Sequence, residues 1–540
     1  MVASVQPDVV IVSRSLDQLP SELLEAIFLY LDLLSILRCR RVSTRLDECI
    51  LFSTRLQYRI ELAGSSLRDG CVKSSTSDRL TAVRRRRKAW DTLSFSTRKV
   101  VSVISAEWKI LCGCHIAWTH SPGHLTVMQI PSAIRNIPEK SWTMTLDGTN
   151  PGRRPSSESD LVMDPDQDLI IYFDVQFDGE QCDLMFRSLS SGEAHPAAAR
   201  ANLQYAIYFS YHLEGSNGVQ IYGDYVAIHL QKRLSRYGEL VDVYNWKKHL
   251  PIFTAKEEII ASAFLANRYL LLVHDGVGSP ITLSVIDMRI VEKRTIYGTP
   301  HIRNIEMDLP VCDLKPLCQF QLPEKRGPYV ASSIVLQTQT AQARTLPVPF
   351  RITNDRLLSM HIVYDGPQRE EMTFIVPVLT IMNGLLKSSA TRRTTFTWDE
   401  WGPQGCRLFR SDFGLDCHVN GLMACMRPLP PPDALPSDEH SVRLLLYDFS
   451  PLAARRCKEE SQEQSTTYWH SSIFKSEEIV TRLPGRRKEI VLDLDKPVSK
   501  LESVCIDIRY RRRTSHPVAK LLKMLVEAGS QSSDIEAEPV

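Results

Sequence analysis

The apolar positions of the chain follow two different periods, and the change between them divides it into a helical N-terminal part and a long β part. Up to about residue 93, apolar residues recur every three or four positions, the period of an amphipathic helix. Beyond about residue 100 the apolar runs are short and bounded by Gly, Pro, Asn and Asp, which is typical of strands joined by turns. The pattern predicts an α+β multidomain chain with N-terminal helices and a large all-β region.

The densest helical pattern lies in residues 19–50, where we expect three short helices. Leu19-Pro20 opens the first helix, of about three turns, because proline at a first helical position removes no helix hydrogen bond. Asp32 is expected to cap the second helix, and Ser43 or Thr44 the third. Three helices this short cannot bury all their apolar side chains among themselves, so some of that surface should meet a partner or the rest of the chain.

These residues resemble the F-box, with which F-box proteins dock on a Skp-family adaptor of a cullin-based ubiquitin ligase. The resemblance has no gaps and includes the family's LPxELLxxIFxxL core. Leu34 stands where the family usually has proline, Ser43 where it often has cysteine, and Leu46 where it favours an aromatic residue. The resemblance implies that the adaptor is bound by Leu19, Pro20, Leu23, Leu24, Ile27, Phe28, Leu31, Leu33, Leu34, Ile36, Leu37, Val42, Leu46 and Ile50. The alternative is a three-helix piece of ordinary protein core.

The predicted domain organisation has five segments. They are a disordered tail over residues 1–14, the F-box over 15–62, a helical linker over 63–99, the β region over 100–508, and a basic patch, short helix and disordered tail over 509–540.

The linker contains one further helical pattern, over residues 77–93, with Leu80, Val83, Arg87 and Trp90 along one side. Its basic run from Arg84 to Lys88 is interpreted as a solvated helix face around a buried Trp90. The run is short and lacks the interleaved aromatic residues of a nucleic-acid site.

A degenerate β-propeller is the predicted fold of residues 100–508, and tandem β-sandwich or barrel domains are the alternative. Such a long series of antiparallel strands without helices must close on itself or repeat radially, because an open sheet exposes unpaired edges. The predicted strands are Lys109–Cys112, Leu125–Ile130, Leu169–Phe173, Leu184–Leu189, Val226–Leu230, Leu240–Trp246, Tyr269–Val273, Ile281–Asp287, Leu357–Tyr364, Met372–Val378, Leu422–Cys425, Val442–Phe449, Glu489–Leu492 and Val504–Ile508.

Polar residues precede several of these strands and suggest a repeat. Asp168, Asp224, Asn267, Asn354 and Asn420 are spaced by 56, 43, 87 and 66 residues. A spacing of 43 fits one propeller blade, and 87 is close to two blades, one of them poorly marked. Asn245-Trp246 and Asp287 resemble worn WD dipeptides at strand ends.

Two segments of the β region are expected to be surface loops, because their prolines and glycines disfavour strands. They are Gly402–Phe413 and the proline-rich Arg427–Ser437.

Charge and hydropathy argue against a nucleic-acid-binding or membrane-spanning protein. The 65 basic and 63 acidic residues leave a net charge of +2, so no global attraction to nucleic acid or anionic membranes is expected. No apolar run approaches the roughly 18 to 20 residues that span a bilayer. We expect an intracellular protein of the cytoplasm, the nucleus or both, with neither a membrane nor a nucleic acid as partner.

The sequence offers few candidate catalytic or metal-binding residues. The nucleotide-binding, metalloprotease and nucleophile-elbow motifs GxxxxGK[ST], GxGxxG, HExxH and GxSxG are all absent. The Cys112-Gly113-Cys114-His115 cluster and the histidines His115, His120 and His124 lack the spacing of a metal site. We therefore expect no catalytic residue, metal or cofactor in this chain.

The resemblance and the predicted fold together imply a function. They favour a non-catalytic subunit that docks on a Skp-family adaptor, and through it on a cullin, and presents an unknown protein substrate on the β region. The alternative is a propeller scaffold that uses the F-box for complex assembly without driving degradation.

Overall fold

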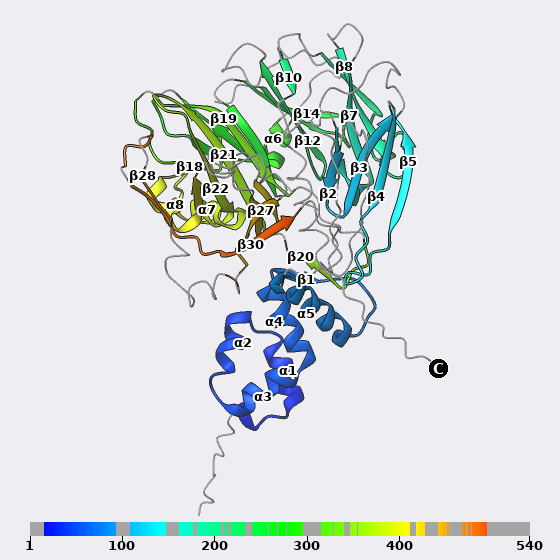
Figure 1. The fold of residues 1–540 in the computed structure, drawn as a ribbon, viewed down its shortest axis with the longest axis vertical. Coiled ribbons are helices and arrows are strands. Elements are labelled where there is room, and N and C mark those ends of the chain that lie inside the picture. Colours follow the sequence, from blue (N-terminus) through cyan, green and yellow to red (C-terminus); the bar gives the residue numbers. More distant parts are fainter. Residues whose placement is uncertain are drawn as a thin grey trace, which may run out of the picture.

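The computed structural model describes residues 16–92 and, with gaps, residues 109–493. The longest internal gaps are residues 147–160, 295–314, 427–440 and 454–466. The predicted N-terminal tail, the proline-rich loop, the strand Val504–Ile508 and the segment 509–540 all lie outside the described residues. The N-terminal helices form a lobe below a larger β body (Figure 1).

Residues 16–92 form a 3₁₀ turn and five helices, including the one predicted over residues 77–93. Their bounds are η1 (Leu16–Gln18), α1 (Ser21–Phe28), α2 (Leu33–Cys39), α3 (Thr44–Phe52), α4 (Thr54–Gly64) and α5 (Thr76–Thr92). Helix α1 ends earlier than the three turns predicted. The Tyr30 N–H donates to the Ile27 carbonyl and the Leu31 N–H to the Phe28 carbonyl, and these shorter-range bonds close the last turn.

The β region has six blades in a propeller arrangement, which confirms the predicted fold over the tandem domains (Figure 1). The first three blades are β2 (Lys109–Cys112), β3 (His115–Ser121), β4 (His124–Gln129) and β5 (Lys140–Thr145); β6 (Leu161–Asp164), β7 (Leu169–Val175), β8 (Gln181–Ser188) and β9 (Asn202–Ala206); and β10 (Tyr211–Leu213), β11 (Val219–Tyr222), β12 (Tyr225–Lys232), β13 (Leu240–Asn245) and β14 (Leu250–Lys256).

The other three blades use strands more widely separated in the chain. They are β15 (Ile259–Ala266), β16 (Tyr269–His274), β17 (Thr282–Asp287), β18 (Cys318–Gln321) and β23 (Thr395–Phe396); β19 (Val330–Thr338), β21 (Leu357–Asp365), β22 (Glu370–Pro377) and β24 (Arg407–Arg410); and β25 (Cys417–Asn420), β26 (Met423–Met426), β27 (Ser441–Asp448) and β30 (Arg486–Asp493). Two small sheets accompany them, β1 (Leu67–Asp69) with β20 (Phe350–Ile352) and β28 (Thr467–His470) with β29 (Glu478–Thr481).

Neighbouring blades meet along a row of inner strands. Strand β2 lies beside β6, β6 beside β11, β11 beside β15, β15 beside β19, and β19 beside β25. This is radial repetition, in which each sheet covers the face of the next and leaves only short edges.

The strand predictions agree with the structure wherever it describes the residues, and so do three of the predicted turn residues, while Asn267 and Asn354 lie outside the described residues. Asp168 precedes the second strand of its blade, Asp224 precedes β12, and Asn420 ends β25 at the turn into β26. Trp246 follows β13 and is buried, with its indole nitrogen 3.0 Å from the Gly223 carbonyl oxygen.

Two predictions about the β region are wrong. The 87-residue interval from Asn267 to Asn354 contains no extra blade among its described residues, because β16 to β18 complete the fourth blade and β19 begins the fifth. The extra length includes α6 (Met288–Arg294) and residues 295–314, which lie outside the described part. The region also contains α7 (Val378–Thr391) and α8 (Trp398–Gly405), so it is not free of helices.

The prediction of a surface loop at Gly402–Phe413 is also wrong. This segment contains the end of α8 and then β24, which pairs with β22. A capping interaction starts α8, with the Thr397 N–H donating to Glu400 Oε2 at 2.8 Å. Trp398 and Trp401 are buried and stack edge to face, 5.5 Å between ring centroids, which anchors the helix despite its glycines and proline.

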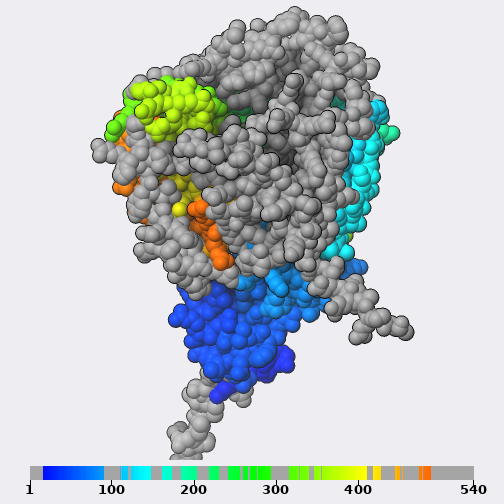
Figure 2. All heavy atoms as spheres, in the orientation of Figure 1, coloured from blue at the N-terminus to red at the C-terminus, as the bar shows by residue number. Residues whose placement is uncertain are grey.

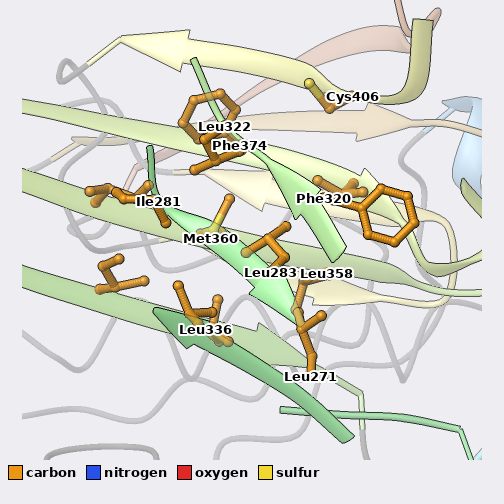
Figure 3. Packing of buried hydrophobic residues seen from close by; sticks show 14 of the residues in the cluster. Leu271, Ile281, Leu283, Phe320, Leu322, Leu336, Leu358, Met360, Phe374 and Cys406 are labelled. Carbon is orange, nitrogen blue, oxygen red and sulfur yellow. The ribbon is translucent and has the colours of Figure 1, made fainter. Parts of the chain in front are cut away.

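Among the described residues, the largest apolar cluster lies between the fourth and fifth blades. Figure 3 shows Leu271 and Leu283 of the fourth blade packed with Leu358 and Met360 of β21. Helices α7 and α8 extend this core, and the resulting cluster joins the two blades into one packed unit.

A joint connects the helical lobe to the propeller. Strand β1 pairs antiparallel with β20, so that Leu67 lies opposite Ile352. Gly70 follows β1 and donates its N–H to the Pro349 carbonyl oxygen at 3.1 Å. A Cβ atom on Gly70 would lie 1.7 Å from the Val348 carbonyl oxygen, so only glycine fits at this close approach.

Side chains of α4 and α5 seal this joint. Tyr58 and Leu62 of α4 and Val83 of α5 form a buried cluster with Phe350 of β20 and Ile134 of the first blade. The lobe and the propeller are thus held by strand pairing together with a small apolar core, not only by a covalent linker.

Candidate functional site

Helices α2, α3 and α4 start at side-chain caps, two of which the sequence predicts. Asp32 accepts a hydrogen bond from the Ser35 N–H at 3.0 Å, and Ser43 accepts one from the Leu46 N–H at 3.2 Å. Ser53 caps α4 in the same way through the Leu56 N–H. These caps satisfy helix donors that would otherwise lack partners, so α2 to α4 begin at defined residues.

Polar contacts tie the helices to one another. Arg45 of α3 donates to the Leu19 carbonyl oxygen at 2.8 Å and so holds the start of α1. Arg40 pairs with Asp47 at 2.6 Å. The arrangement of α1 to α3 therefore rests on a polar frame as well as on the apolar core.

Five of the fourteen predicted adaptor-binding residues lie inside the lobe's own core. Each is at most 3% exposed, and together they surround Leu56 of α4; they are Leu24, Phe28, Ile36, Leu46 and Ile50. Their burial means that they hold the helices together and do not face solvent.

The other nine predicted residues are at least partly accessible. Leu19, Leu31, Leu33 and Leu37 are half-buried, and Pro20 is exposed. The remaining four are exposed apolar side chains, at 53% for Leu23, 38% for Ile27, 60% for Leu34 and 73% for Val42.

Four further exposed apolar residues of this lobe were missed by the sequence reasoning. They are Leu16, Tyr30, Leu51 and Phe52, and Tyr30 and Phe52 are 90% and 83% exposed. Each stands at or just beyond the end of a helix, where the helical period no longer distinguishes a core side chain from a surface one. We call the eight residues Leu16, Leu23, Ile27, Tyr30, Leu34, Val42, Leu51 and Phe52 the exposed apolar set.

Exposed apolar side chains are concentrated on this lobe. Of the eleven exposed large apolar side chains among the described residues, eight belong to it, and the other three are Ile290, Leu379 and Leu386. Helices α1 to α3 stand at the end of the molecule away from the propeller (Figures 1 and 2). Apolar surface gathered in this way is typical of interaction sites.

Comparison with protein families identifies this lobe. Residues 16–60 match the family model described as F-box-like. These residues form an F-box-like domain. The match spans η1, α1, α2, α3 and most of α4, so it includes the exposed apolar set and the core beneath it. A search among curated proteins found no match.

An F-box joined to a six-bladed propeller is the arrangement of a protein-interaction adaptor. F-box domains generally bind a Skp-family adaptor, and propellers present binding surfaces on their loops. Proteins with this combination are typically non-catalytic.

The cysteine and histidine cluster of the first blade is part of the blade's packing. Cys112, Cys114 and His115 are buried, and the Cys114 sulfur lies 3.6 Å from His115 Nδ1. Burial lowers the pKa of His115 to about 4, so its imidazole is neutral at pH 7. Among the residues that the structure describes, no group of three His, Cys, Asp or Glu side chains could hold a metal ion.

The basic run of α5 is partly neutralised within the lobe. Arg87 pairs with Glu61 of α4 at 2.8 Å, and Arg84 approaches the same carboxylate at 3.5 Å. Trp90 is buried as predicted. No helix in the described part of the chain combines the length and apolar character needed to cross a bilayer.

Proposed function

We propose that this chain is the substrate-recognition subunit of an SCF-type ubiquitin ligase. Its F-box docks on a Skp-family adaptor and through it on a cullin, and its propeller presents a target protein. The observation that carries the proposal is the concentration of exposed apolar side chains on the F-box lobe. Such a subunit acts inside the cell, in the cytoplasm or the nucleus.

The adaptor contacts the exposed members of the predicted binding residues. Leu23 and Ile27 lie one turn apart on α1, whereas Leu34 lies in the first turn of α2 and Val42 precedes α3. Burying an exposed leucine or isoleucine side chain stabilises a complex by roughly 1.5–3 kcal/mol, so a few such contacts are sufficient for stable docking. The buried residues, such as Phe28, act indirectly by keeping the helices in place.

Substrate presentation depends on distance and orientation. A subunit that holds a target near a ubiquitin-charged enzyme raises its effective concentration, without supplying a catalytic residue. The β1–β20 pair and the apolar cluster around Tyr58 and Phe350 support this role, because they keep the F-box in a fixed position relative to the propeller.

The docking step is tested by co-purification of the full-length chain with a Skp-family adaptor. Leu34→Asp combined with Val42→Asp is expected to lower adaptor affinity at least about 100-fold, because a charge must then be buried at two contacts. The matched control is Leu379→Asp with Leu386→Asp, which changes two exposed leucines of α7, 50% and 69% exposed. Undiminished adaptor binding by the α1–α3 variant would overturn the proposal, and equal losses in both variants would show a nonspecific effect.

The role in degradation is tested separately from docking. Cells that express the wild-type chain or the Leu34→Asp, Val42→Asp variant are compared by quantitative proteomics, with and without inhibition of cullin activity. We expect proteins bound by both forms to accumulate only with the variant or with the inhibitor. If the abundance of these proteins is the same in all conditions although the wild-type chain binds the adaptor, the chain is a scaffold and not a degradation subunit.

A further inference from the structure

A cleft lies where the linker helix α5 faces the sixth blade, away from the exposed apolar set. Its volume is about 80 Å³. A cavity needs only ~10–15 Å³ to hold one water molecule, so this cleft has room for a ligand of several heavy atoms. Its lining includes Arg86 and Trp90 of α5, Ser66 before β1, Asn420 of β25 and Asp448 of β27.

Arg86 is the charged group that the fold leaves uncompensated in this cleft. It makes no hydrogen bond or close ion pair with the residues that the structure describes, unlike its neighbour Arg87, which pairs with Glu61. Loss of hydration lowers the pKa of its guanidinium to about 10, and repulsion from Arg135 adds to this effect while Asp448 opposes it. The side chain remains charged at pH 7, in surroundings that favour an added anion.

The other charges of the lining offset one another. Arg486 of β30 lies directly opposite Asp448 in the strand register, so these two opposite charges are neighbours. With Arg87 neutralised by Glu61, the cleft carries a net charge of about one positive unit, at Arg86. A singly charged anion matches this balance, whereas a doubly charged phosphate would also face Asp448.

Two polar side chains of the cleft wall lack hydrogen-bond partners among the described residues. Asn420 is 5% exposed, and neither its Oδ1 nor its Nδ2 atom is paired. The hydroxyl of Ser66 is likewise buried and unpaired. Such groups are rare in folded proteins because each loses hydration without compensation. An amide group, which offers one donor and one acceptor, complements the side chain of Asn420.

We propose that this cleft binds the carboxyl-terminal end of a peptide chain. The terminal carboxylate pairs with Arg86, the last peptide groups meet Asn420 and Ser66, and the final side chain packs on Leu422, Met423 and Leu446 of the lining. This site goes beyond the proposed function, because peptide binding here requires neither the adaptor nor the exposed apolar set.

The experiment uses the full-length chain and two probes. One is an equimolar pool of N-acetylated tripeptides with free carboxyl termini, and the other is the same pool with amidated termini. We expect ligand-observed NMR to detect binding of the acids and at least about tenfold weaker binding of the amides, since only the acids make the charge-assisted contact. No binding of the acids at about 1 mM, or equal binding of both pools, would overturn the proposal.

Variants locate the site and separate it from general charge effects. Arg86→Gln should weaken binding of the acid pool at least about tenfold, whereas Arg85→Gln, an exposed neighbour on the same helix, should leave it unchanged. Asp448→Asn removes the carboxylate that the described lining residues supply and should tighten binding, which gives a change of opposite sign if Arg86→Gln fails to fold. The proposal is wrong if folded Arg86→Gln or Asp448→Asn binds like the wild type.

Inorganic phosphate serves as a competitor in the same assay. We expect it to displace the acid pool only at concentrations well above that of an equally effective peptide acid, because it lacks the amide group and the side chain. If phosphate competes as well as the peptide acids, the cleft is a simple oxyanion site and the peptide assignment falls.

Discussion

The hydroxyl oxygen of Tyr58 lies 2.8 Å from the carbonyl oxygen of Pro349, which is 291 residues further along the chain. It also lies 2.7 Å from Oδ1 of Asp69, and Arg79 pairs with that carboxylate at 2.5 Å. Burial, with a further contribution from Asp69, raises the pKa of Tyr58 well above its usual range, so it remains a hydrogen-bond donor. One side chain of the F-box lobe thus contacts both strands of the joint.

Removing this hydroxyl should weaken the joint. Tyr58→Phe removes one hydrogen bond at the joint and leaves the Pro349 carbonyl oxygen with the Gly70 N–H alone, so we expect a loss of about 1 kcal/mol in the free energy of unfolding, measured by urea denaturation. Tyr30→Phe is the matched control, because Tyr30 is 90% exposed. Equal stability of the two variants would contradict the structural role given to Tyr58.

Adding a methyl group at Gly70 should separate β1 from β20. The new Cβ would overlap the Val348 carbonyl oxygen, a backbone atom that cannot rotate away. We expect Gly70→Ala to cost more than about 2 kcal/mol and to speed amide hydrogen exchange at residues 67–70 and 349–352, with α1 to α3 unaffected. Lys73→Ala, an exposed change in the same segment, should have no such effect. Unchanged exchange in the glycine variant would contradict the close approach.

Two phenylalanines of the F-box should respond to alanine in opposite ways. Phe28 is fully buried, so Phe28→Ala should cost about 3–5 kcal/mol of domain stability and lose adaptor binding through unfolding. Phe52 is 83% exposed, so Phe52→Ala should change stability by less than about 0.5 kcal/mol while still weakening the adaptor complex. Thermal denaturation with adaptor titration separates the effects. A folded Phe52→Ala chain with full adaptor affinity would remove this residue from the docking surface.

The pH dependence of stability should report on His115. Its pKa in the folded chain is about 4, compared with an ordinary value near 6.5, so the unfolded state binds more protons between these limits. The neutral imidazole therefore contributes stability above about pH 6.5, and up to about 3 kcal/mol is lost as the pH falls toward 4. Urea denaturation at pH 7.5, 6 and 4.5 measures the slope. His115→Leu should make the slope shallower but not remove it, because burial also lowers the pKa of His274 to about 4. Identical slopes would contradict the burial effect.

The turns and strands of the propeller could be predicted because their signals are local. Asp224 and Asn420 mark turns through their own backbone preferences, and the apolar run at β21 is buried along nearly its whole length, as a strand covered on both faces should be. Helix α8 was missed because Gly402 and Pro403 are loop residues by propensity. The burial of Trp398 and Trp401 outweighs that propensity, and it depends on other strands.

The candidate site shows the same limit within a single helix. Leu23 and Leu24 are neighbours of identical chemistry, yet one is 53% exposed and the other is fully buried. A broad apolar stripe predicts that the helix is amphipathic, but only packing decides which edge faces the core and which remains available to a partner. The cleft between α5 and the sixth blade is lined by residues far apart in the chain, so no local sequence pattern predicts it.

The β1–β20 pair joins two segments that the ribosome synthesises at very different times. Tyr58 emerges long before its partner Pro349, and at roughly 5–20 residues per second the wait is on the order of 15 to 60 seconds. Helices α1 to α3 share a core with Leu56 of α4 and can pack as soon as α4 emerges, but the Tyr58 face of α4 and helix α5 must remain without their β20 partners until the fifth blade is made. The F-box end of the molecule is therefore complete well before it is anchored to the propeller.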